Sequence, residues 1–427
     1  MSQSIEVTDG LIDQSPPARE RVSIMWVILA LFILGAVTVS NLEGWNWLVK
    51  VFGVFLGLAF VINAIRMPTS ISPEIILFIA WLTWALTGVF AAESSVIFWT
   101  QWTTTFQIWV LLIIVAGFTT SSKALSLNML AFLIGTFILG AYSYLTGEYA
   151  RAEARETRLT AMAMNANTFG WVMVLATAAL LYFWMLPARW RWLKYALLAG
   201  GLMAAGAGVV LSGSRTAMVG LGALYFFWVW FCYRKRLLRE PLTVAVTVVA
   251  VVVLIVLLLS LMERTGGLER FSSSWQILGG HQTGEGSTGT RIRLIKVAWD
   301  LLWEHPFTGV GLANFRIASG MWLYAHNEFA EVAATTGAPG FVLYFAIFYV
   351  LWRRTGLLAK HTDDPTVART MGLIRAVILV YLLTGIGNIH YYDKSMWIVF
   401  GSFIGYTAAA WNALRARLPQ APGVAAA

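Results

Sequence analysis

The chain has 427 residues, of which 59% are hydrophobic and only 12% are charged, whereas soluble domains carry about 25% charged residues. This composition excludes a soluble globular protein and predicts an all-α, polytopic integral membrane protein with about 12 transmembrane helices. The formal net charge of +9 does not indicate nucleic acid, because basic residues also hold the cytoplasmic loops of membrane proteins in place.

Apolar segments long enough to cross a bilayer follow one another along the chain, since a transmembrane helix needs roughly 20 apolar residues. We expect them near residues 24–40, 45–65, 74–92, 98–119, 124–146, 168–187, 194–213, 216–233, 242–262, 338–353, 371–391 and 395–413. The segment before Ser23 is polar, so the first apolar run is expected to be an uncleaved span.

The spans divide the chain into an ordered series of regions. We expect a cytoplasmic tail (1–22), helices 1–9 (23–262) with a short outer loop (147–167), a large outer loop (263–337), helices 10–12 (338–416) and a cytoplasmic tail (417–427). Of the 30 Lys and Arg residues, this orientation puts 18 in short cytoplasmic loops, six in short outer loops and six in the long loop. The positive-inside rule therefore favours both termini in the cytoplasm.

Three outer regions remain basic against this rule. They are the loop 147–167, the single Arg215 and the long loop 263–337. Positive charge kept on the outer face, close to the apolar phase, indicates an anionic ligand held at the membrane surface.

Arg215 stands between two apolar runs, where a charge is costly and usually faces a cavity or a partner. Ser212, Gly213 and Ser214 precede it and leave backbone N–H groups at the start of the next helix, which is a ready anion site. The structural alternative is an arginine that reaches phospholipid headgroups.

Arg291 is predicted to open an amphipathic helix in the interface, with Arg293 also near its start. The segment 287–290 supplies capping residues. The apolar residues at helical spacing are Ile292, Ile295, Trp299 and Leu302. The alternative is a basic interfacial helix that touches anionic lipid.

His326 is followed by Asn327 and, nine residues later, by the Gly337-Ala-Pro-Gly340 segment. Histidine is the side chain best suited to move a proton near neutral pH. Taken alone, a histidine beside an apolar helix is more often structural. Its position in a loop with outer arginines favours a chemical role.

No metal or cofactor is expected. The chain has one cysteine, Cys232, and its outer acidic residues are scattered, with no metal-binding motif among them. An enzyme that acts on a phosphate without a metal needs arginines to neutralise the charge.

The motifs together resemble the bacterial O-antigen ligases, a branch of a superfamily that also contains O-antigen polymerases and protein O-oligosaccharyltransferases. His326-Asn327 with Gly337-x-x-Gly340 resembles the family's signature, and Ser214-Arg215 resembles its S-R turn. The segment 158–167 resembles its R-x-T … N-P-N segment, with Ala166 in place of the usual proline. Thr290-Arg291, followed by Trp299, Pro306 and Gly309-Val-Gly311, resembles the opening of its periplasmic loop. The resemblance covers roughly residues 155–345.

The resemblance implies a GT-C-like glycosyltransferase of the bacterial inner membrane. Its outer loops would be periplasmic, and the large loop 263–337 would be catalytic and would contain amphipathic helices. Its donor would be O-antigen on undecaprenyl pyrophosphate, and its acceptor a hydroxyl of the lipid A–core oligosaccharide. Transfer would be metal-independent and inverting. Arg215 and Arg291 would bind the pyrophosphate, and His326 would orient or deprotonate the acceptor. The remaining residues expected to bind substrate are Arg158, Asn167, Ser214, Arg293 and Asn327.

Two alternatives stay open from the sequence. One is a sister activity, O-antigen polymerase or protein O-oligosaccharyltransferase. The latter often has a large periplasmic region after its last span, whereas this chain ends in the short segment 415–427. The other is a transporter of lipid-linked glycan, for which paired half-sites in two repeats are expected.

Overall fold

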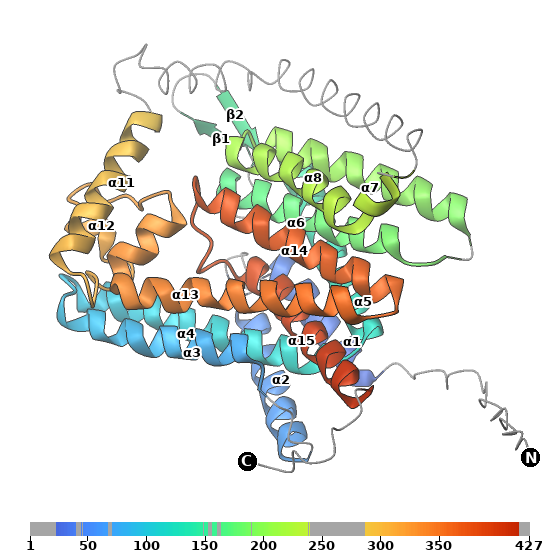
Figure 1. Cartoon of the computed structure of the whole chain (residues 1–427). Coiled ribbons are helices and arrows are strands. Elements are labelled where there is room, and N and C mark those ends of the chain that lie inside the picture. The colour runs from blue at the N-terminus through green and yellow to red at the C-terminus, as the bar shows by residue number, and fades with distance from the viewer. Residues whose placement is uncertain are drawn as a thin grey trace, which may run out of the picture.

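The structure is a computed structural model that describes residues 23–39, 46–66, 71–147, 149–152, 156–159, 164–188, 190–237 and 287–417, together with Gly44 and Arg239. Helices dominate it (Figure 1). In chain order the elements are α1 (Ile24–Thr38), α2 (Asn46–Arg66), α3 (Pro73–Ala85), the 3-10 helix η2 (Leu86–Phe90), α4 (Ser95–Phe118), α5 (Ser122–Thr146), β1 (Tyr149–Ala152), β2 (Glu156–Leu159), α6 (Ala166–Met185), α7 (Arg191–Leu211), α8 (Arg215–Leu237), α11 (Ser287–Glu304), α12 (Phe315–Ala318), α13 (Glu328–His361), α14 (Pro365–Gly385) and α15 (Lys394–Arg417).

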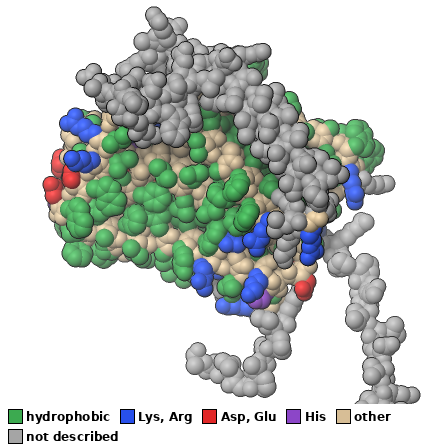
Figure 2. All heavy atoms as spheres, turned by 45° about the horizontal axis from the view of Figure 1, so that its top comes forward, with side chains coloured by type: hydrophobic (Ala, Val, Ile, Leu, Met, Phe, Trp, Pro, Cys, Tyr) green, Lys and Arg blue, Asp and Glu red, His purple; other side chains and the backbone are tan. Residues whose placement is uncertain are grey.

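The polytopic all-α class is confirmed. Among the described residues, eight helical segments are long and apolar enough to cross a membrane, and two shorter apolar helices lie in α1 and α2. Eleven of the twelve predicted spans coincide with a helix, although α15 is not one of the eight; the predicted span 242–262 lies outside the described residues. Figure 2 shows a broad band of hydrophobic side chains between ends where charged side chains gather.

One short sheet interrupts the helical pattern. β1 and β2 pair antiparallel, with Ala150 opposite Arg158, inside the loop predicted at 147–167. β2 contacts α6 and α7, which places the backbone of Arg158 beside these helices. No strand was expected here, because strands of four residues have too little pattern to recognise.

The core is centred on α6. In the apolar stretch of α6, 83% of the residues are buried, more than in any other candidate span. It packs against α5, α7, α8 and α14, while α13 lies between α3 and α14 (Figure 1). This packing brings together the starts of α8 and α13 and the end of α14, which are far apart in the sequence.

α13 is a hairpin rather than a straight helix. Gly337 has φ 69° and ψ −179°, which breaks the helix. The rings of Phe329 and Phe345 stack 4.8 Å apart, whereas a straight helix would separate these residues by about 24 Å. Residues 328–336, the short arm, therefore fold back along residues 338–361, the long arm.

Only glycine fits at this reversal. A Cβ on Gly337 would lie 2.2 Å from the carbonyl oxygen of Phe307, and its φ is in the left-handed region. The short arm is helical and lies in the predicted loop 263–337, which was expected to contain helices. Asn327 caps it, since its Oδ1 accepts a hydrogen bond from the N–H of Ala330 at 2.9 Å.

α11 starts earlier than expected. It begins at Ser287 rather than at Arg291, so Arg291 lies in its second turn. Ile292 and Trp299, from the predicted apolar face, are 52% and 45% exposed. The buried face consists of Leu294, Ala298 and Leu301, which pack in one cluster with Ala330 and Ala334 of the short arm. The short arm's small alanines give α11 a surface for close approach, which the sequence of α11 alone does not reveal.

Candidate active site

Three segments meet at the turn formed by Ile386 and Gly387, which follows α14 and is called here the 386–387 turn. Asn327 Nδ2 donates a hydrogen bond to the carbonyl oxygen of Ile386 at 3.0 Å. Arg291 Nη1 donates to the carbonyl oxygen of Gly387 at 3.4 Å. A Cβ on Gly387 would lie 2.7 Å from Thr216 Oγ1, so the first turn of α8 packs against the same place.

Arg215 is the first residue of α8, and it is half-buried next to Thr216. Ser214 Oγ accepts a hydrogen bond from the N–H of Ala217 at 3.3 Å, which caps the helix. A Cβ on Gly170 would lie 2.6 Å from Ser212 Oγ, so α6 supports this cap closely. The sequence Ser-Gly-Ser-Arg thus sets an arginine at a helix start that α6 holds in place.

Two helices begin beside the 386–387 turn. One is α8, whose residue Thr216 contacts Gly387, and the other is the short arm, whose cap Asn327 bonds to Ile386. Helix N-termini carry partial positive charge and exposed N–H groups. Together with the guanidinium groups of Arg215 and Arg291, they make this region suited to bind an anion.

His326 occupies a constrained position directly before the short arm. Its φ is 51°, a left-handed conformation that is uncommon for residues other than glycine. The turn is held on both sides, because Asn327 caps the short arm and Glu331 Oε2 accepts from the N–H of Ala325 at 2.7 Å. Backbone strain of this kind costs about 1–3 kcal/mol and is concentrated at functional sites.

The electrostatics of His326 tie it to Arg291. Burial, and next the positive charge of Arg291, lower the pKa of His326 from 6.5 to about 4. The imidazole is therefore neutral at neutral pH and has a ring nitrogen free of a proton. Such a group accepts a proton or a hydrogen bond from a hydroxyl.

Three further residues predicted to bind substrate come from α6, β2 and α11. Asn167 is in the first turn of α6, after the cap Asn165, and is half-buried. Arg158 is in β2, and its side chain lies outside what the structure describes. Arg293 is exposed, and residues two positions apart face nearly opposite sides of a helix, so the structure does not bring it to the turn with Arg291.

The sequence did not lead us to expect two buried acidic residues near the 386–387 turn. Glu328 and Glu331 read as scattered acidic residues of an outer loop, but they are only 1% and 0% exposed. Glu328 Oε1 accepts hydrogen bonds from Tyr344 Oη at 2.6 Å and Tyr381 Oη at 2.8 Å, and Oε2 accepts from the N–H of His390. Glu328 thus ties the short arm to the long arm, to α14 and to the loop after the 386–387 turn. The sequence feature that could have revealed them is the pair Glu328 and Glu331 in the first turn of a helix capped by Asn327.

His390 is a second histidine whose pKa is depressed. It is 1% exposed and its ring centroid lies 4.5 Å from that of Trp171. Burial lowers its pKa from 6.5 to about 3. It is therefore neutral in the folded protein over the whole physiological range.

We expect His390 to make the protein less stable in acid. In the unfolded chain a histidine takes up a proton below pH 6.5, and in the folded protein only near pH 3, so stability falls as the pH drops through this window. Between pH 6.5 and 5 the loss is about 2 kcal/mol. Thermal unfolding of His390→Phe in detergent should show a weaker loss between pH 7.5 and 5 than the wild type. His361→Gln, at an exposed position, is the matched control. An unchanged pH dependence in His390→Phe would contradict this expectation.

The described residues contain no group of three or more His, Cys, Asp or Glu side chains that could hold a metal ion. The groups in this region that could bind an anion are the arginines and the two helix N-termini. Arg215 and Arg291 are 76 positions apart in the chain. The packing of α8 and α11 around the 386–387 turn brings the two residues to one region.

Comparison with known proteins gives one family match. Residues 200–345 match the family model described as O-antigen ligase. No curated protein sequence matches the chain. The matched region contains Arg215, Arg291, His326 and Asn327, and it ends within the hairpin of α13. The match over residues 200–345, together with the helices long and apolar enough to cross a membrane, supports membership of the O-antigen ligase superfamily.

Proposed function

We propose that this protein is an O-antigen ligase of the bacterial inner membrane. It transfers a glycan from undecaprenyl pyrophosphate to a hydroxyl of the lipid A–core oligosaccharide at the periplasmic face, which completes lipopolysaccharide. The observation that supports the proposal most strongly is the contact of Arg291 with Gly387, against which Thr216, the residue after Arg215, also packs. The charge of Arg291 also helps to lower the pKa of His326. A pyrophosphate leaving group that gains negative charge and a hydroxyl nucleophile suit this combination of two cations and one neutral base.

The two arginines act on the donor. Arg215 and Arg291 bind the pyrophosphate, with the N-termini of α8 and the short arm beside them. As the bond between the sugar C1 and the phosphate oxygen breaks, its electron pair passes to the pyrophosphate. Donors placed at such a developing charge contribute about 2.7–4 kcal/mol each.

His326 acts on the acceptor. The acceptor oxygen attacks C1 from the face opposite the pyrophosphate, so the new C–O bond forms with inversion, and His326 takes the hydroxyl proton. A bound pyrophosphate offsets the charge of Arg291 that depresses the pKa of His326. The donor therefore raises the pKa of His326 and makes it a stronger base when both substrates are present.

The test is a deletion strain, with and without this gene, whose lipopolysaccharide is separated on a gel. The gene should restore the O-antigen ladder, and the purified protein should join lipid-linked glycan to lipid A–core. Longer glycans that remain on the lipid carrier would indicate a polymerase instead. Glycan attached to protein would indicate a protein O-oligosaccharyltransferase.

We expect the site to face the periplasm. The predicted topology puts 147–165 and 263–337 outside, and 234–241 and 353–370 inside, because 18 basic residues lie in the inner short loops and six in the outer ones. In a Cys232→Ser background, an impermeant maleimide added to intact cells should label Glu304→Cys but not Lys360→Cys. Both positions are exposed, so accessibility within the protein is equal. Labelling of Lys360→Cys alone would reverse the orientation.

A further inference from the structure

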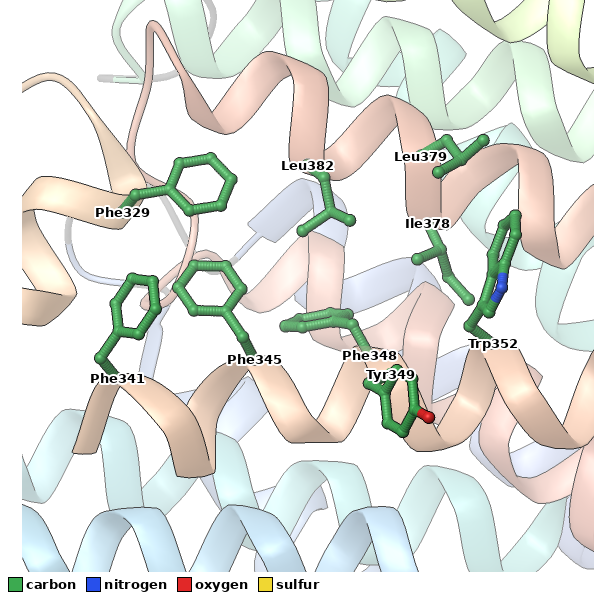
Figure 3. A pocket seen from close by; sticks show the side chains of 9 residues that line it. All are labelled: Phe329, Phe341, Phe345, Phe348, Tyr349, Trp352, Ile378, Leu379 and Leu382. Carbon is green, nitrogen blue, oxygen red and sulfur yellow. The ribbon is translucent and has the colours of Figure 1, made fainter. Parts of the chain in front are cut away.

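An apolar groove of about 400 Å³ lies between α13 and α14 (Figure 3). Phe329, Phe341 and Phe345 line it from the hairpin, and Leu379 and Leu382 line it from α14. Trp352 stands farther along the long arm, at the end away from Phe329 and Phe341 (Figure 3). The lining is almost free of polar atoms, so a hydrocarbon is the class of ligand that it suits.

The hairpin builds the mouth of this groove. The rings of Phe329 and Phe345 are stacked at 4.8 Å with an interplanar angle of 6°, and Phe341 lies 4.7 Å from Phe345. Phe329 belongs to the short arm, so this aromatic wall exists only because the chain reverses at Gly337. The same reversal sets His326 in place.

The mouth adjoins the candidate active site. Phe329 is two residues after Asn327, and Leu382 is four residues before Ile386, a separation of about 6 Å along a helix.

From Phe341 to Trp352 the groove follows the long arm for about 17 Å, which is more than half of a hydrocarbon core of about 30 Å. Tyr349, which also lines the groove, is 60% exposed, so one side is open at the protein surface.

We propose that the groove binds the polyprenyl tail of the donor and admits the donor sideways from the membrane. The inference rests on the proposed function. Arg291 and the helix N-termini lie near the mouth, and apolar side chains line the rest of the groove. This arrangement is complementary to an amphiphile with an anionic head and one long apolar tail.

The covalent structure of the substrates selects the donor over the acceptor. The polyprenyl chain is bonded directly to the pyrophosphate, so it must leave the reaction centre at the 386–387 turn. The acyl chains of the acceptor are separated from its reacting hydroxyl by the core oligosaccharide. The acyl chains can therefore lie away from the mouth of the groove while the acceptor hydroxyl reacts.

Leu379→Trp tests the groove, because it fills the deeper part without touching the residues around the 386–387 turn. It should raise the KM for an undecaprenyl donor roughly tenfold, the loss expected when about two buried methylene groups lose their contacts. A donor with a short polyprenyl tail that ends above Leu379 should be unaffected. Val342→Trp, on the lipid-exposed face of the long arm, is the matched control and should change neither KM. Equal effects of Leu379→Trp on the long-tailed and short-tailed donors would overturn the proposal.

Cross-linking gives a second measurement that does not depend on transfer. A benzophenone amino acid at Phe345 should capture radiolabelled undecaprenyl phosphate in vesicles, and one at Val342 should capture much less. Capture of phospholipid alone at Phe345, or equal capture at both positions, would contradict the proposal. Failure of the wild type to transfer glycan to lipid A–core would overturn the proposed function instead, whatever the cross-linking shows.

Discussion

His326→Ala is expected to abolish glycan transfer while the donor still binds. The substitution removes the group that takes the acceptor proton, and loss of such a base costs roughly 10²–10⁴-fold in rate. Arg215 and Arg291 remain in place to hold the pyrophosphate. In cells, lipid-linked O-antigen should accumulate and lipid A–core should stay unmodified, both of which are measured by extraction and gel analysis.

The backbone at His326 provides a sharper control. Alanine at φ 51° is strained, whereas asparagine tolerates this conformation. His326→Asn therefore removes the base and keeps the turn, and it should be as inactive as His326→Ala but better folded. EDTA should leave the wild-type rate unchanged, because the proposed mechanism uses no metal. Near-normal activity per folded enzyme in both variants would remove His326 from the mechanism.

Replacement of Arg215 or Arg291 by lysine is expected to reduce transfer about 10²–10³-fold for each, the loss typical of one donor at a developing charge. Lysine keeps the charge but lacks the planar fork that binds phosphate oxygens in pairs. Both variants should insert and fold, since neither arginine belongs to the buried core. Purified protein with saturating acceptor gives the rate, and titration of the donor gives its KM.

Arg293→Lys is the matched control for this pair. Arg293 is on the same helix as Arg291 but is exposed, so its replacement should change the rate little. A normal O-antigen ladder from both Arg215→Lys and Arg291→Lys would show that these arginines only anchor the protein at the interface. A defect in Arg293→Lys equal to that in Arg291→Lys would mean that general basic charge matters rather than its geometry.

The membrane architecture was predictable because it depends on local composition. A helix in lipid needs an uninterrupted apolar stretch of roughly 20 residues, and such stretches are visible one at a time in the sequence. The candidate chemistry was also visible locally. Arg215 interrupts an apolar region, and the His326-Asn327 pair precedes a glycine-rich segment. Costly or unusual residues in an apolar chain indicate function before any contact is known.

Other features required the tertiary structure. The reversal at Gly337 depends on the sign of one φ angle, which the residue permits but does not impose. That reversal buries Glu328, covers one face of α11 and creates the wall of the apolar groove. The 386–387 turn could not be linked to Asn327, 59 positions away, or to Arg291, 96 positions away, by any local pattern. Contacts between such distant segments are decided by how whole helices pack, because each helix has more than one face that could be buried.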